Sequence, residues 1–407
     1  MTNIVTITAN DYCHSVFDGT HATPKPCPNG YKLVTSKNIT SDGINISDAY
    51  FISEQDYFEI NKRSKVCQWD ILFSMIGTVG NLYLEENSNI DYAIKNIGVF
   101  SCQDEFKAKW LFYYLQSPMA KNHIKRFLNG AVQKFLSLEQ LRNFPILPFE
   151  KDKIPIVEIL SALDKKIALN KQINARLEEM AKTLYDYWFV QFDFPDANGK
   201  LYKSSGGEMV FDETLKRKIP KGWEVKSLNQ VADIVMGQSP DGASYNLEQE
   251  GTIFFQGSTD FDWRFPNVRQ YTTSPTRFAQ KGDILLSVRA PVGDLNISPF
   301  ECCIGRGLAA LRSKSGNNSF LFYVMKYFKT VFERRNTEGT TFGSITKDDL
   351  HSLKLVAPAD NVLEKYNEIA SKYDEMIFIR SQQSHQLTQL RDFLLPMLMN
   401  GQVSVAE

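Results

Sequence analysis

The sequence lacks the features of a membrane protein, of an exported protein and of a disulfide-stabilised one. No apolar run within its 407 residues approaches the roughly 18 residues that span a bilayer. The first residues do not show the basic-then-apolar pattern of a signal peptide, so we do not expect export. The six cysteines are scattered and form no C-x-x-C pair, which favours a reduced, cytoplasmic setting.

Motifs that bind a nucleotide, a methyl donor or a catalytic metal are also missing. There is no G-x-x-x-x-G-K-[ST] loop for ATP, no [ND]-P-P-[FYW] tetrapeptide of the kind that amino-methyltransferases carry, and no H-E-x-x-H zinc motif. We therefore expect a chain with no catalytic residue, no metal site and no cofactor of its own.

The sequence has no surplus of charge of one sign. It contains 46 basic and 47 acidic residues, for a net charge of -1. Residues 1–149 hold 14 of each kind, and residues 192–359 hold 21 basic and 19 acidic residues. This balance excludes a uniformly basic nucleic-acid-binding protein, but it allows basic side chains to cluster on one face.

What the sequence does contain is a repeat of itself, at a spacing of about 210 residues. DILFSMIGTVGNL in the first copy and DILLSVRAPVGDL in the second are identical at seven of thirteen positions. The order of the matches is the same in both copies. The matching segments are 70–82 with 283–295, 110–115 with 320–325, and 162–172 with 372–382.

A period this long indicates two copies of one module, because solenoid repeats are only about 20–50 residues long. The front part of each module has short runs of β-branched and aromatic residues between turn residues, which predicts short strands. The back part has helical periodicity. The predicted parts are 1–150 and 221–358 for the two front domains, 151–191 and 359–401 for two long helices, and 192–220 for a polar linker.

Both helical parts have apolar residues at alternating spacings of four and three, the heptad pattern of a coiled coil. No Pro or Gly interrupts the first helix between Ile156 and Trp188, which predicts a length of roughly 50 Å. The predicted contact positions are Ile156, Leu160, Leu163, Ile167, Asn170, Asn174, Leu177, Leu184 and Trp188 in the first helix, and Ile377, Arg380, Ser384, Leu387, Leu394 and Leu398 in the second.

Both seams become polar at the same level, at Asn170 and Asn174 in the first helix and at Arg380 and Ser384 in the second. Antiparallel pairing about the midpoints would bring Asn170 to Ser384 and Asn174 to Arg380. A polar layer of this kind fixes register and orientation at some cost in stability.

A second apolar stripe runs along each helix beside the predicted seam. Two helices cannot bury so wide a surface, so we expect another protein to cover it, with packing on the adjoining front domain as the alternative. The stripe contains Ile159, Ile173, Met180 and Tyr187 in the first helix, and Ile369, Met376, Leu390 and Met397 in the second.

Two variable front domains, each followed by one of two related long helices, resemble the specificity (S) subunit of Type I restriction–modification enzymes. The resemblance covers nearly the whole chain, although the first half has no evident counterpart of PKGWE and is expected to begin differently. The segments that carry it are PKGWEVKSLNQVADI (220–234), GDILLSV with Val292-Gly293, DGTHATPK (18–25), and the helical segments 163–190 and 388–405.

The resemblance implies an α+β fold, with two similar mixed α/β target-recognition domains separated by two long antiparallel coiled-coil helices in a pseudo-twofold arrangement. It implies a non-catalytic subunit whose domains each bind one half of a split double-stranded DNA target. The helices would set the spacing and dock two methyltransferase (modification) subunits, which bind S-adenosylmethionine and methylate adenine. Two restriction (motor-nuclease) subunits would use ATP and Mg²⁺.

Base edges in DNA are contacted by polar and basic side chains, which loops can present without disturbing a core. Two of the candidates have a structural alternative, since Arg264 could stack on Trp263 and Arg289 could brace the neighbouring turn. The candidates are His21, Lys25, Gln133 and Lys134 in the first domain, and Gln238, Ser239, Arg264, Arg289, Arg306, Thr340 and Thr341 in the second.

Two other functions remain open from the sequence. A free-standing metal-dependent nuclease is one, because Asp196, Glu224 and Lys226 match a loose P-D…E-x-K pattern. A helical scaffold with two protein-binding domains is the other, and it predicts no DNA sequence preference.

Overall fold

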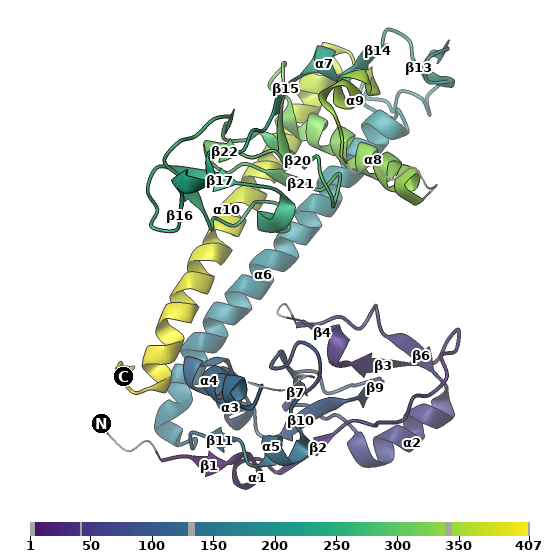
Figure 1. Ribbon diagram of the computed structural model, residues 1–407. Coiled ribbons are helices and arrows are strands. Elements are labelled where there is room, and N and C mark those ends of the chain that lie inside the picture. Colours follow the sequence, from purple (N-terminus) through teal and green to yellow (C-terminus); the bar gives the residue numbers. More distant parts are fainter. Residues whose placement is uncertain (1–4, 41–42, 129–134, 338–343, 406–407) are drawn as a thin grey trace. The chain divides into compact units, whose positions relative to one another are not determined.

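The computed structural model describes residues 5–40, 43–128, 135–337 and 344–405. The chain forms two compact units, Met1–Leu169 with Gln383–Glu407 and Asn170–Gln382. Each unit combines an α/β domain with part of each of two long helices, α6 and α10 (Figure 1). The long helices are α6 (Ile154–Tyr185), which continues as a short π-helical segment (Asp186–Val190), and α10 (Asp360–Met399).

A four-stranded antiparallel sheet forms the centre of the first unit, in the order β2-β10-β7-β8. Its two inner strands, β10 and β7, are buried on both faces. Ile71 and Phe73 point to the side of the domain helices, whereas Leu72 points to a second layer of strands. The strands are β2 (Ser15–Asp18), β7 (Asp70–Ser74), β8 (Leu82–Leu84) and β10 (Ile97–Ser101).

The second unit repeats this sheet strand for strand, in the order β15-β23-β20-β21. Ile284 and Leu286 of β20 face the domain helices and Leu285 faces the other layer. The sequence repeat is therefore a repeat of topology. The strands are β15 (Ala232–Met236), β20 (Ile284–Ser287), β21 (Leu295–Ile297) and β23 (Leu308–Ser313).

The two domains also begin alike, although their first residues differ in sequence. In each, a strand pairs with the last strand of the domain, a short capped helix follows, and the chain then enters the central sheet. The first domain therefore has structural counterparts of the strand and the helix that begin at Glu224, the last residue of PKGWE. The elements are β1 (Ile7–Thr8), α1 (Ala9–Tyr12) and β11 (Pro145–Ile146), matched by β14 (Glu224–Ser227), α7 (Leu228–Val231) and β24 (Lys354–Ala357).

Helices cover one face of each central sheet, and they include the two matching segments 110–115 and 320–325. Trp110, Tyr114 and Phe322 are buried there. The polar tips of the two first-unit rings are satisfied, since Trp110 Nε1 donates to Leu147 O at 3.0 Å and Tyr114 Oη to Pro145 O at 2.7 Å. The helices are α3 (Glu105–Gln116), α4 (Pro118–Leu128) and α5 (Leu138–Arg142), matched by α8 (Asn318–Thr337) and α9 (Lys347–Ser352).

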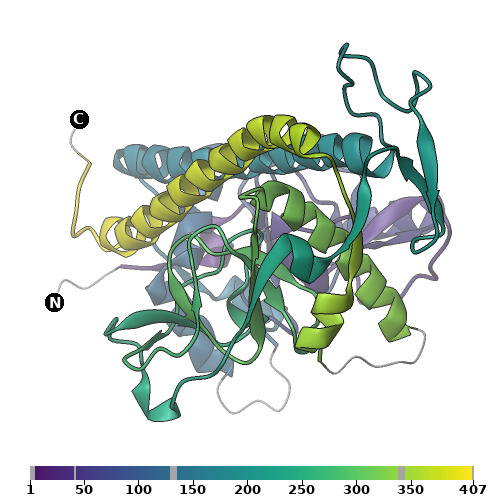
Figure 2. The ribbon, with the colours of Figure 1, turned by 90° about the horizontal axis from the view of Figure 1, so that it is seen from above.

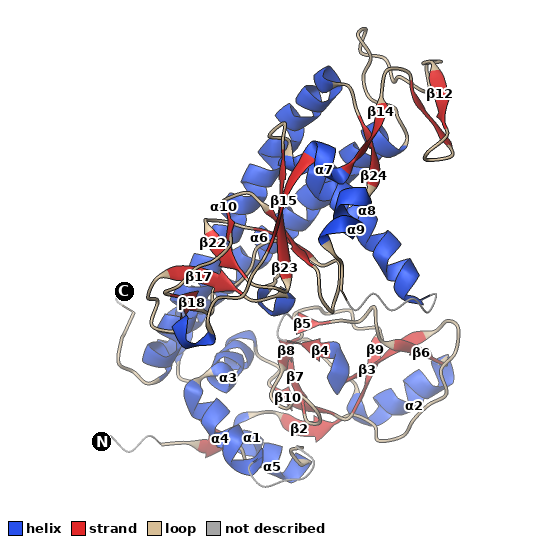
Figure 3. Ribbon diagram, turned by 45° about the horizontal axis from the view of Figure 1, so that its top comes forward, coloured by secondary structure: helices blue, strands red, loops and turns tan. Residues whose placement is uncertain are grey.

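The other face of each sheet carries the layer in which the two domains differ most (Figure 3). Both layers contain one parallel strand pair, β3 with β9 and β17 with β22. The first layer adds β6 and an α-helix, and the second adds three short strands. The elements are β3 (Tyr31–Thr35), β6 (Tyr50–Ile52), α2 (Glu54–Ser64) and β9 (Tyr92–Lys95), against β16 (Tyr245–Asn246), β17 (Thr252–Phe255), β18 (Tyr271–Thr272), β19 (Phe278–Ala279) and β22 (Cys302–Ile304).

Smaller elements complete the described chain. The predicted linker is not irregular throughout, because β12 and β13 form an antiparallel hairpin within it. The remaining elements are β4 (Ile39–Thr40), β5 (Gly43–Ile44), β12 (Met209–Asp212) and β13 (Arg217–Pro220).

Within each unit α6 and α10 lie side by side and run antiparallel, as predicted (Figure 2). In the first unit, Arg391 of α10 forms a 2.8 Å ion pair with Asp164 of α6. In the second unit, Asn174 donates to Ser381 Oγ at 3.0 Å, and the Trp188 ring is 5.9 Å from that of Tyr366. Residue numbers therefore rise along α6 while those of the contacting residues fall along α10, as in an antiparallel pair.

The polar layer differs in one pairing from the prediction. Asn174 bonds to Ser381, not to Arg380 one position earlier, because a short hydroxyl fits between two packed helices at hydrogen-bonding distance. Asn170 and Asn174 are buried, as a seam position requires. Asn170 and Ser384 belong to different units, and their pairing stays a prediction.

Most of the predicted seam is shielded from solvent. The buried members are Ile156, Leu160, Ile167, Asn170, Asn174, Leu177, Trp188, Ile377 and Leu398, and the half-buried ones are Leu163, Leu184, Arg380, Ser384, Leu387 and Leu394.

The central sheets differ at one buried carboxylate. Asp70 begins β7 and is only 1% exposed, and the strand residue opposite it is Ser101. Burial raises the pKa of Asp70 to about 6. The corresponding Asp283 accepts from Arg312, at 2.7 Å from Nε and 2.8 Å from Nη2. The first domain has therefore kept the acid without the basic partner.

This carboxylate should make the first unit less stable as the pH rises. Between the ordinary pKa of 3.8 and about 6, the folded state binds more protons than the unfolded state, so the free energy of unfolding falls with pH across that interval. Asp70→Asn should remove this fall and be the more stable protein above pH 6, by at most about 3 kcal/mol. Urea unfolding at pH 4, 5, 6 and 7 measures the difference.

Asp283→Asn is the matched control, because it deprives Arg312 of its carboxylate and should destabilise the protein at pH 7. Parallel pH profiles for the wild type and Asp70→Asn would contradict the assignment.

Candidate nucleic-acid interface

Three loops meet at one edge of the second domain: the loop after β15, the loop after β17 and the loop between β22 and β23. The backbones approach so closely that only glycine fits. A Cβ at Gly237 would lie 2.2 Å from Gly305 O, and one at Gly307 would lie 2.7 Å from Gln256 O. The sequence therefore holds these three loops at fixed positions.

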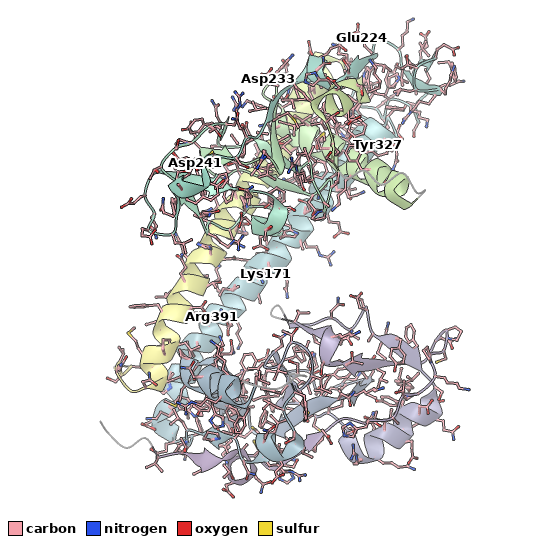
Figure 4. All side chains as sticks on the ribbon, in the orientation of Figure 1. Lys171, Glu224, Asp233, Asp241, Tyr327 and Arg391 are labelled. Atoms are coloured by element: carbon pink, nitrogen blue, oxygen red, sulfur yellow. The ribbon has the colours of Figure 1, made fainter. Side chains whose placement is uncertain are left out.

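Four polar side chains share this edge. Ser239 Oγ accepts from Arg306 Nε at 3.3 Å, from the Arg306 backbone N–H at 3.2 Å and from Gln256 Nε2 at 3.2 Å. Gln238 and Arg306 are exposed. The next turn begins at Asp241, which is labelled in Figure 4. The structure thus brings Arg306 together with Gln238 and Ser239, which lie far from it in the sequence.

Gln256 was not among the candidates predicted from the sequence. It directly follows β17, whose last two residues are buried. A polar residue at the point where a strand ends was the available signal.

At the corresponding edge of the first domain, His21 lies between two acceptors. Its Nδ1 is 2.8 Å from Asn96 Oδ1, and its Nε2 is 3.0 Å from Asp18 Oδ2. His21 and Lys25 are exposed. Asn96 was not predicted, and its φ of 54° in the turn between β9 and β10 is a conformation that asparagine tolerates better than most residues.

The other candidates fall elsewhere. Arg289 is exposed in the loop between β20 and β21, where its backbone forms a bridge with Ser344. Gln133, Lys134, Thr340 and Thr341 lie outside the described residues.

Arg264 is a wrong prediction, because its side chain is only 2% exposed. Its two terminal nitrogens form ion pairs with Glu178 of α6 and Asp374 of α10, and its guanidinium lies over the ring of Phe322 at 4.1 Å. Lys326 of α8 also pairs with Glu178. Reaching DNA would leave two half-buried carboxylates without this partner, so Arg264 instead holds the domain onto both helices.

Removing this buried charge should destabilise the second unit strongly. Burial already raises the pKa of Asp374, and Arg264→Met leaves that carboxylate without its guanidinium. We expect a loss of about 3–5 kcal/mol in the free energy of unfolding, measured by urea titration. Arg264→Met with Asp374→Asn should recover part of the loss.

Arg306→Met is the control, since that arginine is exposed and should change stability by less than about 0.5 kcal/mol. If Arg264→Met is as stable as the wild type, the buried ion pairs do not hold the domain.

The residues of the nuclease hypothesis have local roles in the structure. Asp196 Oδ1 accepts from the backbone of Asn198 at 2.8 Å and of Lys200 at 2.9 Å, which caps a turn. Glu224, labelled in Figure 4, forms a 3.3 Å ion pair with Lys226 on the same strand. Within the described ranges, no three His, Cys, Asp or Glu side chains gather as a metal site would require. No described helix is long and apolar enough to cross a membrane.

Two α/β domains of one topology, each with a polar loop edge and each packed on an antiparallel helix pair, define a duplicated recognition protein. The chain belongs to the family of the Type I restriction modification DNA specificity domain, whose model matches residues 22–179 and 220–389. The two matched segments correspond to the two copies of the repeat.

Known proteins agree with this assignment. The putative type I restriction enzyme MjaX specificity subunit of Methanocaldococcus jannaschii is 32% identical over 393 residues, which is 92% of this chain and 88% of that protein. The MjaIX specificity subunit of the same organism is 25% identical over 75% of this chain and 71% of its own length. The crystal structure of the Type-I restriction-modification system S subunit from M. genitalium has the same fold, with a TM-score of 0.61 at 14% identity over 98% of this chain and 97% of that one.

The resemblance found in the sequence is thus confirmed, and the chain is a DNA specificity subunit of the Type I restriction–modification kind. The comparisons give no support to the nuclease alternative.

Proposed function

We propose that each α/β domain recognises one half of a split DNA target, in a cytoplasmic complex whose chemistry belongs to other subunits. Two modification subunits would bind S-adenosylmethionine and methylate adenine, and two restriction subunits would use ATP and Mg²⁺ to move along DNA and cleave it. The observation that carries this proposal is the duplication itself: one strand order occurs twice, with different polar side chains at the loop edge.

The two domains share one topology but carry different side chains at their loop edges, which favours two different half-targets. Two identical edges would read the same sequence twice, whereas these edges present different hydrogen-bonding groups. The side chains proposed to contact DNA are His21, Lys25, Gln133, Lys134, Gln238, Ser239, Arg289, Arg306, Thr340 and Thr341.

Neither domain has the charge of a strong phosphate binder. Residues 1–149 hold 14 basic and 14 acidic side chains, and phosphate contacts supply much of the affinity of DNA-binding proteins. The modification subunits would therefore provide part of the contact with the DNA backbone, and the isolated chain should bind DNA weakly.

The long helices would set the spacing between the half-targets. They run without a break over 32 residues in α6 and 40 in α10. At about 1.5 Å per residue, each is longer than the ~34 Å of one duplex turn. A rigid spacer of this length leaves bases between the half-targets unread, which predicts a gap of constant length.

Exposed apolar side chains on the helices support the docking of two copies of one partner. They recur in pairs at the spacing of the repeat, with the first member of each pair on α6 and the second on α10. Such side chains are unusual on a solvent-facing surface unless a partner covers them. The pairs are Ile159 with Ile369, Leu169 with Ile379, and Met180 with Leu390.

A shallow groove of the second unit is lined by one of these side chains, Met180. Met180 and Tyr187 line it together with Tyr373 of α10 and Leu201 of the linker, and its volume is about 460 Å³. Its lining is mostly apolar, which suits a protein side chain better than nucleic acid. Every lining residue belongs to the second unit.

The function can be tested by co-expressing the chain with its modification subunit and mapping methylated adenines across a genome. We expect a two-part motif with a constant gap. Exchanging residues 1–150 for those of a relative should change one half of the motif and leave the other half and the gap unchanged. A continuous motif, or changes in both halves, would contradict the division of labour between the domains.

The docking surface can be tested with two equivalent substitutions. Met180→Asp and Leu390→Asp replace side chains that are 51% and 45% exposed. A carboxylate in an apolar interface should weaken binding of one modification subunit at least tenfold. Native mass spectrometry should show that each single variant binds one modification subunit and that the double variant binds none.

The matched controls are Gln172→Asp and Gln382→Asp, which place the same charge on exposed positions of the same two helices. Both should retain two modification subunits. Two bound subunits in the Met180→Asp, Leu390→Asp double variant would show that this surface is not the dock.

A further inference from the structure

The edge loops of the second domain are held by two backbone hydrogen bonds to the central sheet and its neighbour. Gly237 N–H donates to Leu308 O at 2.9 Å, and Gln238 N–H donates to Ile304 O at 3.0 Å. These bonds fix where the chain leaves β15. They also place Arg306, the second residue after Ile304, beside the residue that follows Gln238.

The first domain makes the same two bonds with different residues. Gly19 N–H donates to Ile97 O at 2.8 Å, and Thr20 N–H donates to Ile94 O at 3.0 Å. Asn96 is the second residue after Ile94. A Cβ at Gly19 would lie 2.6 Å from Ile94 O, so glycine is required here for the reason that applies to Gly237.

The backbone therefore defines three equivalent positions in the two domains: two consecutive residues after the strand and its glycine, and one residue in the facing turn. In both domains, the second and third of these side chains are bonded to each other, at 2.8 Å in the first domain and 3.3 Å in the second. The positions are Thr20, His21 and Asn96 in the first domain, and Gln238, Ser239 and Arg306 in the second.

We propose that these three positions determine the specificity of each domain, and that Arg306 reads a guanine in the half-target of the second domain. This inference rests on the proposed function and adds the residues and the base. The same two backbone hydrogen bonds occur in both domains, although the facing turn is one residue longer in the second. Every side chain at the three positions differs, so the base that is read can change without a change in fold.

The geometry of Arg306 suits guanine. Its Nε and its backbone N–H both face Ser239 Oγ, which orients the guanidinium. Among the described residues, none accepts a hydrogen bond from its two terminal nitrogens. Two parallel N–H donors match O6 and N7 of guanine in the major groove, whereas adenine presents an amino group in place of O6.

The first domain presents a different group at the same place. Asn96 Oδ1 is occupied by His21, which is itself held by Asp18. The side-chain amide N–H₂ of Asn96 then remains to donate to a base edge. Its two N–H bonds diverge from one nitrogen and do not form the parallel pair that matches O6 and N7 of guanine together, so we expect the first domain to lack the guanine requirement at this position.

The test uses the chain in complex with its modification subunit and reads the methylated motif of each variant. The wild type should require guanine at a position in the half-target assigned to the second domain by the exchange of residues 1–150. Arg306→Gln should lower the preference for guanine there at least tenfold, and the other half-target should not change. Ser239→Ala should lower the same preference by less, because it releases the Arg306 Nε.

Arg306→Lys separates base reading from phosphate binding. It keeps the charge but loses the two-donor fork, so the guanine preference should fall while the affinity for non-specific DNA stays within about twofold. If Arg306 contacts phosphate instead, Arg306→Lys will keep the motif and Arg306→Gln will weaken all sequences equally, which overturns the inference. Arg217→Gln, in the exposed hairpin of the linker, is the control and should leave the motif unchanged.

The motifs distinguish a failure of guanine reading by Arg306 from a failure of the proposed function. A two-part wild-type motif that Arg306→Gln does not alter overturns the reading of guanine and leaves the proposed function intact. Absence of a two-part motif in the wild type overturns both. Binding of the modification subunit by each variant, measured alongside, shows that the variant is folded.

Discussion

In each domain the two inner strands of the central sheet are buried on both faces, and the rest of the domain depends on that burial. β7 and β20 place alternate side chains into two separate cores, one shared with the domain helices and one with the second layer of strands. A strand that supports two cores cannot slip by one residue without exchanging their side chains. This constraint explains why DILFS and DILLS are the best-matched part of the repeat.

The same constraint leaves the loop edges free to change. The strands hold the backbone, and Gly19 and Gly237 allow adjacent loops to approach within bonding distance of it. Side chains just beyond these glycines bear on neither core. Their chemistry can therefore vary while the fold is kept, as His21 and Ser239 illustrate. A subunit that supplies specificity to a shared enzyme requires this combination of a fixed frame and a variable edge.

Buried charged side chains also fix the orientation of each domain on the long helices. Arg264 joins the second domain to both long helices through Glu178 and Asp374, at a site where solvent does not screen the ion pairs. In the first unit, Asp164 accepts from Tyr113 of α3 at 2.9 Å and also pairs with Arg391. Polar contacts of this kind are directional, so they specify how a domain sits on its helices more strictly than apolar packing does.

Much of the architecture could be predicted because it depends on periodicity. The two modules and the two long helices follow from patterns that many residues share, and the structure has both. The start of the first domain was not found, since β1, α1 and β2 match their counterparts in hydrogen bonding and not in residue type. The partner of Asn174 was missed by one residue, because heptads locate a face of a helix and not a single contact.

The amino-acid sequence by itself determined the duplication, the paired helices and the family. Each of the three is a pattern formed by many residues, so it can be recognised even where single residues depart from it. Only the tertiary structure decided which polar side chains act together. Arg264 and Arg306 are both arginines in polar loops, yet one is buried between carboxylates and the other is exposed at the recognition edge. Their difference arises from residues more than 60 positions away along the chain, such as Glu178 and Ser239, which folding alone brings into contact.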